Sequence, residues 1–193
     1  IPFNNETQNL TMFTSASKYL FNLHTTLNIK SSFKISVFNQ LQNGLLQQFT
    51  NQSNNISIGI APQINKWLNI SYNGSFTKLN SKINNLATGK QSVTQMQHSF
   101  EANIFAGKKL FFKLKADNFY VKQSFINNAN NYFFVDAAVK FKANKLKTDF
   151  VLDCINLANT KEYSIINVNA NNVIENSFLI RPRMIIVKAF FNF

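Results

Sequence analysis

The sequence predicts an all-β fold, an antiparallel transmembrane β-barrel to which this chain contributes about nine strands. Three observations lead to this prediction. Apolar and polar residues alternate with a period of two over long segments, as in strands that have one apolar and one polar face. Helix-favouring patterns are almost absent, whereas the weak helix formers Phe, Ile, Val, Thr and Asn occur throughout. The gaps between segments alternate between short and long, which is typical of outer-membrane barrels.

The composition fits strands with one apolar face and one neutral polar face. The chain has 193 residues, and residues 1–193 are predicted to form one partial barrel domain. Charged residues make up 15%, below the usual level of about a quarter, whereas Phe occurs 21 times. No apolar run reaches the roughly 18 residues of a transmembrane helix, so a membrane crossing would have to use strands.

Nine strands are predicted, each near or above the roughly 9–11 residues that cross an outer membrane. Candidate turns separate them, at 18–22, 42–44, 62–66, 80–90, 107–109, 127–131, 143–145 and 159–176. The strands have the approximate ranges 5–17, 24–41, 45–61, 67–80, 92–106, 109–123, 131–143, 146–158 and 177–193.

The alternation identifies the two faces of several segments. It is clearest in 131–143, where the odd positions from Phe133 to Phe141 are apolar and the even positions are mostly polar, softened by Phe134 and Ala138. Taken in chain order, the earlier apolar faces comprise Leu27, Ile29, Phe33, Ile35 and Val37, then Leu68, Ile70, Tyr72 and Phe76, then Phe112, Leu114 and Ala116. The neighbours of these residues are mainly Asn, Ser, Lys and Asp, which predicts a wet opposite face.

The gap lengths are consistent with one orientation in a membrane. If Phe193 ends in the periplasm, the tight turns 107–109 and 143–145 both fall on the periplasmic side. The gap at Asn43-Gly44 departs from this trend, because it has the sequence of a tight hairpin. In the same orientation, the longer Asn-rich loops lie on the extracellular side, at 80–90, 127–131 and 159–176.

A soluble β-sandwich is the alternative fold, since it is also built from alternating strands. Sandwich strands are nearer five or six residues, and their turns use more Gly and Pro. The long segments of this chain and its three prolines favour the membrane barrel.

The last segment has an apolar face and a terminal aromatic residue. Its odd positions from Ile185 to Phe193 are all apolar, and Lys188 and Asn192 lie on the other side. Ile186 and Phe190 interrupt that second side, which suits an interior partly filled by protein. A terminal aromatic residue at the membrane boundary fits the aromatic girdle of such barrels.

The C-terminal third resembles TonB-dependent receptors of Bacteroidota. Ile180-Arg181-Pro182-Arg183, with the terminal Phe193, is similar to the last strand of that family. Residues 131–136 (Asn-Tyr-Phe-Phe-Val-Asp) and 153–163 (Asp-Cys-Ile-Asn-Leu-Ala-Asn-Thr-Lys-Glu-Tyr) are also similar, although Ala158 stands where the family usually has Phe. The resemblance covers about the last 65 residues, and before them it is only architectural.

The resemblance implies a barrel of 22 strands with an N-terminal plug inside it. It implies active uptake of a scarce ligand across the bacterial outer membrane, energised by an inner-membrane protein through the plug. Because the chain starts without an initiator Met or signal peptide, we expect it to be a fragment or processed product lacking the plug and the first strands. Its expected partners are outer-membrane lipid, the rest of the barrel and plug, and the barrel-assembly machinery.

Candidate site residues follow from the predicted faces and the resemblance. Five inward charged residues could pair across strands or line an ion path, namely Lys113, Lys115, Asp117, Asp136 and Lys140. The resemblance implies that Phe191 and Phe193 belong to the signal read by the assembly machinery. Ligand selection is expected mainly in the outer loops 80–90, 125–131 and 159–176.

Other function classes have little support. The net charge of +12 and pI near 9.9 could indicate nucleic-acid binding, but the lysines recur singly along strand-like segments without a nucleic-acid-binding motif. Neither a metal site nor a cofactor site is predicted, since Cys154 is the single cysteine. His24 and His98 could serve a barrel enzyme, but no nucleophile motif accompanies them, so no enzymatic activity is predicted. A non-transport barrel, either a scaffold or a passive pore, remains the alternative function.

Overall fold

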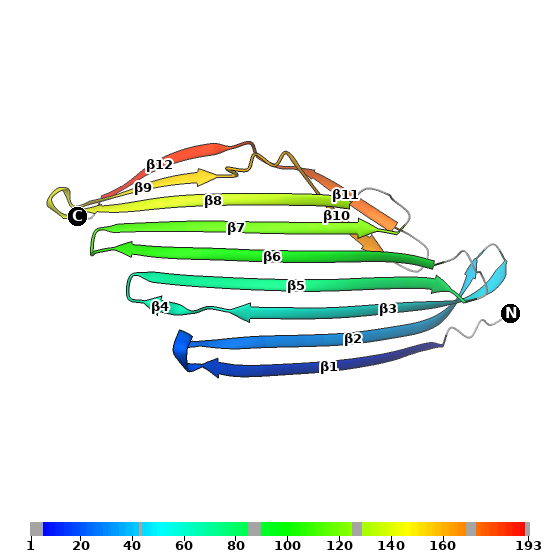
Figure 1. The fold of residues 1–193 in the computed structure, drawn as a ribbon. Coiled ribbons are helices and arrows are strands. Elements are labelled where there is room, and N and C mark those ends of the chain that lie inside the picture. Colours follow the sequence, from blue (N-terminus) through cyan, green and yellow to red (C-terminus); the bar gives the residue numbers. More distant parts are fainter. Residues whose placement is uncertain (1–5, 43, 85–89, 125–128, 169–172, 192–193) are drawn as a thin grey trace.

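The computed structural model describes residues 6–42, 44–84, 90–124, 129–168 and 173–191, and these residues form an all-β fold (Figure 1). The helical segments among them are two single 3-10 turns, η1 (Phe21–Leu23) and η2 (Asn144–Leu146). The strands are β1 (Thr7–Leu20), β2 (Thr25–Gln42), β3 (Leu45–Ile60), β4 (Gln63–Asn65), β5 (Leu68–Ile83), β6 (Lys90–Ala106), β7 (Leu110–Gln123), β8 (Ala129–Ala143), β9 (Thr148–Ile155), β10 (Glu162–Val168), β11 (Val173–Leu179) and β12 (Met184–Phe191).

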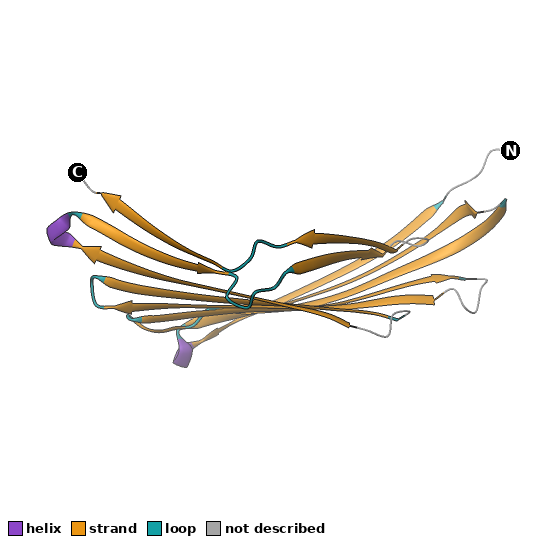
Figure 2. Ribbon diagram, turned by 90° about the horizontal axis from the view of Figure 1, so that it is seen from above, coloured by secondary structure: helices purple, strands orange, loops and turns teal. Residues whose placement is uncertain are grey.

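Nine strands form one antiparallel ladder in the order β1-β2-β3-β5-β6-β7-β8-β9-β12, and β4 pairs with the start of β5. This confirms the prediction of an all-β antiparallel sheet of about nine strands. The sheet is not closed into a barrel. Within the described residues β1 and β12 are its two edges, and Figure 2 shows an open, curved trough.

The predicted strand boundaries are close to those of the structure through the middle of the chain. The segment 45–61 becomes β3, and 92–106 becomes β6, which starts two residues earlier. The first strand is shifted toward the C-terminus, because the chain reverses at η1 rather than at 18–22. The correct boundaries follow from long alternating segments, where the period is repeated often enough to be unambiguous.

Two predictions about the C-terminal region are wrong. Residues 159–176 are not a simple loop, and 177–193 is not one strand, because β10 and β11 form a separate antiparallel hairpin. The chain then leaves the hairpin at residues 180–183 and joins the ladder as β12, which starts only at Met184. Pro182 explains the break, since proline cannot donate a ladder hydrogen bond.

Successive connections alternate between the two opposite ends of the sheet (Figure 1). We call one end the turn end; its connections are 21–24, 61–67, 107–109 and 144–147. The other is the loop end, where the connections are 43–44, 84–89, 124–128 and 156–183. The predicted tight turns at 107–109 and near 143–145 therefore share one end, as expected from the gap lengths.

The ladder register assigns each strand side chain to one of two faces. One row crosses five strands, from Ile104 through Phe112, Val139 and Leu152 to Val187. We call the face that carries this row the convex face. The opposite, concave face holds the β10–β11 hairpin (Figure 2).

The convex face is apolar and exposed from one edge of the sheet to the other. Val187 near one edge is 72% exposed, and Leu10 in the other edge strand is 48% exposed. Nothing in the described parts of the chain covers this face. Its exposed large apolar residues are Leu10, Met12, Ile29, Leu41, Leu46, Ile56, Ile58, Ile104, Phe112, Leu114, Phe133, Phe141, Phe150, Leu152, Ile185, Val187 and Phe191.

A small cluster of buried apolar residues lies on the concave side of the sheet. Val93 and Val121 are buried beneath Ile166 of β10, with Leu79 packed beside them. This cluster attaches the hairpin to the sheet. No helix among the described residues is long and apolar enough to cross a lipid bilayer.

Gly107 provides a test of the turn between β6 and β7. Its φ is +69°, and a Cβ there would meet no atom within 4 Å. Gly107→Val should therefore lower the free energy of unfolding by about 1–2 kcal/mol through backbone strain alone. Chemical unfolding in detergent measures this change. Gly107→Asn is the matched control and should lose less, because Asn tolerates the left-handed conformation; equal losses for both variants would contradict the strain argument.

Candidate functional site on the concave face

Charged side chains of the concave face form ion pairs along β6 to β9 and β12. Lys113 Nζ lies 3.0 Å from Glu101 Oε2, and Lys115 Nζ lies 2.9 Å from Asp117 Oδ2. Two further pairs are Lys140 Nζ with Asp149 Oδ2 at 2.8 Å and Lys188 Nζ with Asp153 Oδ2 at 2.6 Å. Partly exposed pairs of this kind contribute only about 0–1 kcal/mol each, so they neutralise and order the wall more than they stabilise it.

The five predicted inward charged residues all lie on this face. Lys113, Lys115, Asp117 and Lys140 are held in the ion pairs, and Asp136 has a different role. The positive charge of each of these three lysines is therefore balanced by a neighbouring carboxylate. That these residues line a lumen stays a prediction.

Asp136 and Asn156 together anchor the long connection after β9. The Asp136 carboxylate accepts a 2.8 Å hydrogen bond from the backbone N–H of Asn156, which is 3% exposed and has a φ of +54°. The Asn156 side chain donates at 2.9 Å to the carbonyls of Thr160 and Arg181, and its Oδ1 accepts from the Thr160 N–H at 3.0 Å. One buried amide thus joins the start and the end of the segment that carries the hairpin.

Two further bonds connect this turn to β8. The N–H of Leu157 donates at 2.7 Å to the carbonyl of Val135, and the Thr160 hydroxyl donates to the carbonyl of Phe133. The residues that resemble the family motif, Asn156-Leu157-Ala158-Asn159-Thr160, are therefore the residues that fold this turn. Their spacing places both ends of the hairpin over the concave face.

The hairpin packs against the concave face through aromatic and apolar contacts. The Tyr163 ring lies 5.3 Å from Phe119, 5.1 Å from Tyr132 and 5.9 Å from Phe134, in edge-on geometry. Burial, and secondarily the neighbouring Tyr132, raises the pKa of the Tyr163 hydroxyl. The folded state therefore loses stability relative to the unfolded chain as the pH rises from the ordinary tyrosine pKa through that raised pKa.

A second attachment lies farther along β10. The Gln95 side chain donates at 3.2 Å to the carbonyl of Ile166, whose side chain covers Val93 and Val121. The hairpin is consequently attached to the sheet at two positions along β10, Tyr163 and Ile166, and lies in front of β6, β7 and β8. Sequence reasoning missed these contacts, because only the tertiary fold brings residues 162–168 to β6.

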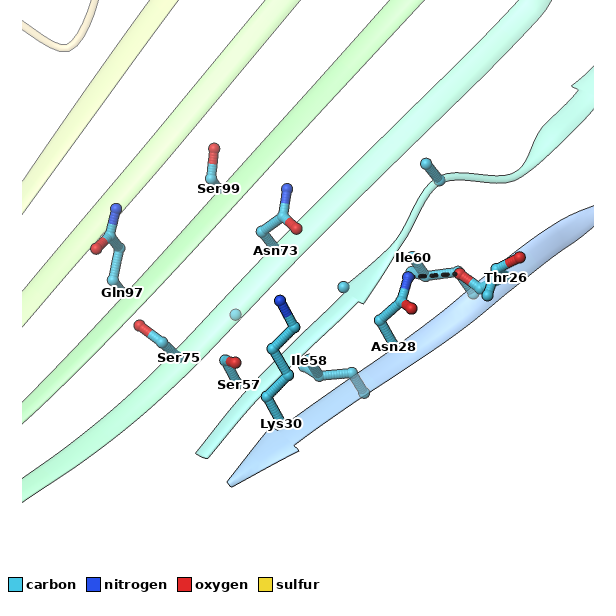
Figure 3. A pocket seen from close by; sticks show the side chains of 13 residues that line it. Thr26, Asn28, Lys30, Ser57, Ile58, Ile60, Asn73, Ser75, Gln97 and Ser99 are labelled. Carbon is cyan, nitrogen blue, oxygen red and sulfur yellow. Dashed lines mark hydrogen bonds between the residues drawn. The ribbon is translucent and has the colours of Figure 1, made fainter. Parts of the chain in front are cut away.

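A shallow pocket of about 560 Å³ lies on the concave face over β2, β3, β5 and β6 (Figure 3). Lys30 is the single charged residue of its lining. Figure 3 shows amide and hydroxyl side chains around it, including Asn28, Asn73, Ser75 and Gln97. Such a surface can donate and accept hydrogen bonds with a neutral polar ligand.

The remaining candidate residues are dispersed. His24 ends η1 with a φ of +45°, whereas the His98 ring accepts or donates a 2.8 Å hydrogen bond with the Tyr72 hydroxyl on the convex face. Cys154 is a half-buried free thiol on the convex face. The described residues hold no group of three or more His, Cys, Asp or Glu side chains that could bind a metal.

The two C-terminal aromatics are only partly described. Phe191 lies on the convex face opposite Thr148 and is 66% exposed. Phe193 lies outside the described residues. Their role as an assembly signal stays a prediction.

Asn156→Ala should release the hairpin from the sheet. Removing the amide leaves the Thr160 N–H and two carbonyls without that partner, and we expect a loss of about 2–3 kcal/mol. Hydrogen exchange of β10 and β11 should accelerate while β6 and β7 stay protected. Asn159→Ala is the matched control, because Asn159 also has a left-handed φ of +56° but is exposed. Equal exchange rates in the two variants would exclude the anchoring role.

Comparison with family models, with curated proteins and with solved structures finds no match to this chain. The resemblance to TonB-dependent receptors therefore rests only on the motifs in this chain's own sequence.

Proposed function

We propose that the sheet is a section of an outer-membrane β-barrel wall, in which the convex face contacts lipid and the concave face borders the lumen. The observation that carries this proposal is the contrast between the faces. The convex face is apolar across nine strands and uncovered in the described structure, whereas all four described ion pairs lie on the concave face. A soluble sandwich would need a second sheet over the apolar face.

The energies of burial and the dimensions of the convex face favour lipid as the environment of that face. Fully burying a Leu, Ile or Phe side chain stabilises by about 1.5–3 kcal/mol, more than one of these surface ion pairs contributes. At about 4.8 Å per strand, nine strands make the apolar face roughly 40 Å wide. In β8 the apolar positions run from Phe133 to Phe141, about 26 Å along the strand at about 3.3 Å per residue. A strand tilt of about 40° converts this to roughly 20 Å, close to the apolar band of about 25 Å in outer-membrane barrels.

The free edges require further strands. In lipid every backbone N–H and C=O must be paired, and only a closed ladder pairs them all. The outer side of β1 and that of β12 have no strand partner within the described residues. The barrel is completed by strands from the same polypeptide or from another chain.

Within this class we propose a receptor or transporter of the TonB-dependent type, which takes up a scarce ligand. The C-terminal motifs support this assignment, and so does the hairpin, because an inward-folded segment suits an occupied lumen. A passive pore or scaffold is the second candidate, favoured by the neutral, hydrogen-bonding pocket around Lys30. The preceding gene sequence separates them: a plug with an energy-coupling segment means active transport.

An arginine on the convex face should prevent membrane integration. Leu114, among the apolar convex positions 110–116 of β7, is 42% exposed, and Leu114→Arg should cost about 2–4 kcal/mol near the bilayer midplane. The measurement is the fraction of protein resistant to carbonate extraction from outer membranes. Asn73→Arg places the same charge on the exposed concave face and should integrate normally. Equal integration of both variants would refute the membrane orientation.

The chain alone should not form a closed channel, because its two edges stay unpaired. After refolding in detergent, we expect strand-rich circular dichroism but neither heat-resistant migration in electrophoresis nor stable single-channel conductance. Neighbouring barrel strands, if co-refolded, should restore heat resistance. A heat-resistant conducting species from this chain alone would contradict the requirement for further strands.

A further inference from the structure

The carboxylates of the ladder all lie on one face of the sheet, whereas lysines lie on both faces. All five carboxylates in the nine-stranded ladder, Glu101, Asp117, Asp136, Asp149 and Asp153, lie on the concave face. The convex face of the ladder carries lysines and no acidic residue in its described registers. Those lysines are Lys18, Lys78, Lys82, Lys90 and Lys122.

Four of these lysines gather at the loop end of β5, β6 and β7, and we call Lys78, Lys82, Lys90 and Lys122 the lysine cluster. Lys82 lies directly opposite Lys90 in the ladder. Lys78 and Lys122 share one row, separated only by Thr94, so their backbones are about 10 Å apart. All four side chains are exposed.

The lysine cluster has no anionic partner among the described residues. None of the described ion pairs includes these lysines. The neighbouring connections 84–89 and 124–128 contain no Asp or Glu in their sequence. Like charges directly opposite each other destabilise a ladder, so an anion from outside the chain would relieve the repulsion between Lys82 and Lys90.

The position of the cluster identifies the kind of anion. It begins one row beyond the apolar row formed by Phe76, Met96 and Tyr120 of the same strands. A membrane has its phosphate groups at this boundary, immediately outside the hydrocarbon. The same rows supply neutral hydrogen-bonding side chains, among them Asn80, Ser92 and Thr94.

We propose that the lysine cluster binds the phosphate groups of anionic lipid headgroups in the leaflet at the loop end of the sheet. This inference rests on the proposed membrane orientation. It assigns the cluster to lipid held against the outside of the wall, apart from any ligand that passes through the lumen. The cations contact the phosphates, and the adjoining apolar rows contact the acyl chains of the same lipid.

The test is binding of the purified full chain to neutral maltoside micelles doped with phosphatidic acid. Lys78→Gln/Lys82→Gln/Lys90→Gln/Lys122→Gln should weaken binding at least about tenfold, because each lysine near an anionic lipid surface contributes to attraction. The matched control removes four exposed lysines at the turn end, Lys66→Gln/Lys108→Gln/Lys145→Gln/Lys147→Gln, and should change binding by less than about twofold. Equal weakening in both variants would overturn the proposal.

A single charge reversal separates binding from folding. Lys90→Glu replaces the like-charge pair by an ion pair between Lys82 and the new carboxylate. The variant should therefore have a higher unfolding midpoint and weaker binding to the doped micelles. Weaker binding accompanied by a lower midpoint would indicate a merely structural role and contradict the site.

Two competitors define the ligand. Inorganic phosphate at the same phosphate concentration should not displace the doped micelles, and neither should a short DNA duplex. Displacement by either competitor would show that the cluster binds a soluble anion and not a lipid headgroup. The micelle assay needs no closed barrel. If the lysine variant loses micelle binding while Leu114→Arg and Asn73→Arg integrate equally, the lipid site is retained and the barrel assignment is rejected. If micelle binding is unchanged while Leu114→Arg alone fails to integrate, only the lipid site is rejected.

Discussion

The continuous register of one antiparallel ladder is the constraint on which the rest of the structure depends. A slip of one residue would carry every side chain of a strand to the other face. In this ladder the row from Ile104 to Val187 stays apolar across five strands, while the adjacent rows on the opposite face include Lys113, Lys140, Asp153 and Lys188. Both the apolar surface and the charged wall follow from that single alignment.

The β10–β11 hairpin packs against the concave face and covers part of it. Asn156 holds the two ends of its connecting segment, and Tyr163 and Ile166 seat it on aromatic and aliphatic residues of β6 to β8. The apolar residues Phe119, Phe134 and Val121 of the concave face lie beneath the hairpin, which covers them. In the proposed barrel, a segment of this kind partly fills the lumen and narrows the path beside it.

The strand pattern was predictable wherever the alternation was long, as in 131–143 and 45–61. It was not predictable at the C-terminus, where Pro182 divides the predicted last strand and the Asn-rich stretch before it folds into a hairpin. The inward charges Lys113, Lys115 and Lys140 could be chosen from parity alone. The partners of Lys113 and Lys140 could not, because Glu101 and Asp149 lie on neighbouring strands and their pairing depends on the register between strands.

The sequence by itself determined that this chain is built of long strands with one apolar and one polar side, because a period of two is a local property of the residues. Only the tertiary structure decided which side chains meet. Gln95 reaches Ile166 across 71 positions of sequence, and Lys82 comes to lie opposite Lys90, because the fold brings distant residues together. Such contacts depend on strand order and register, which no local pattern encodes.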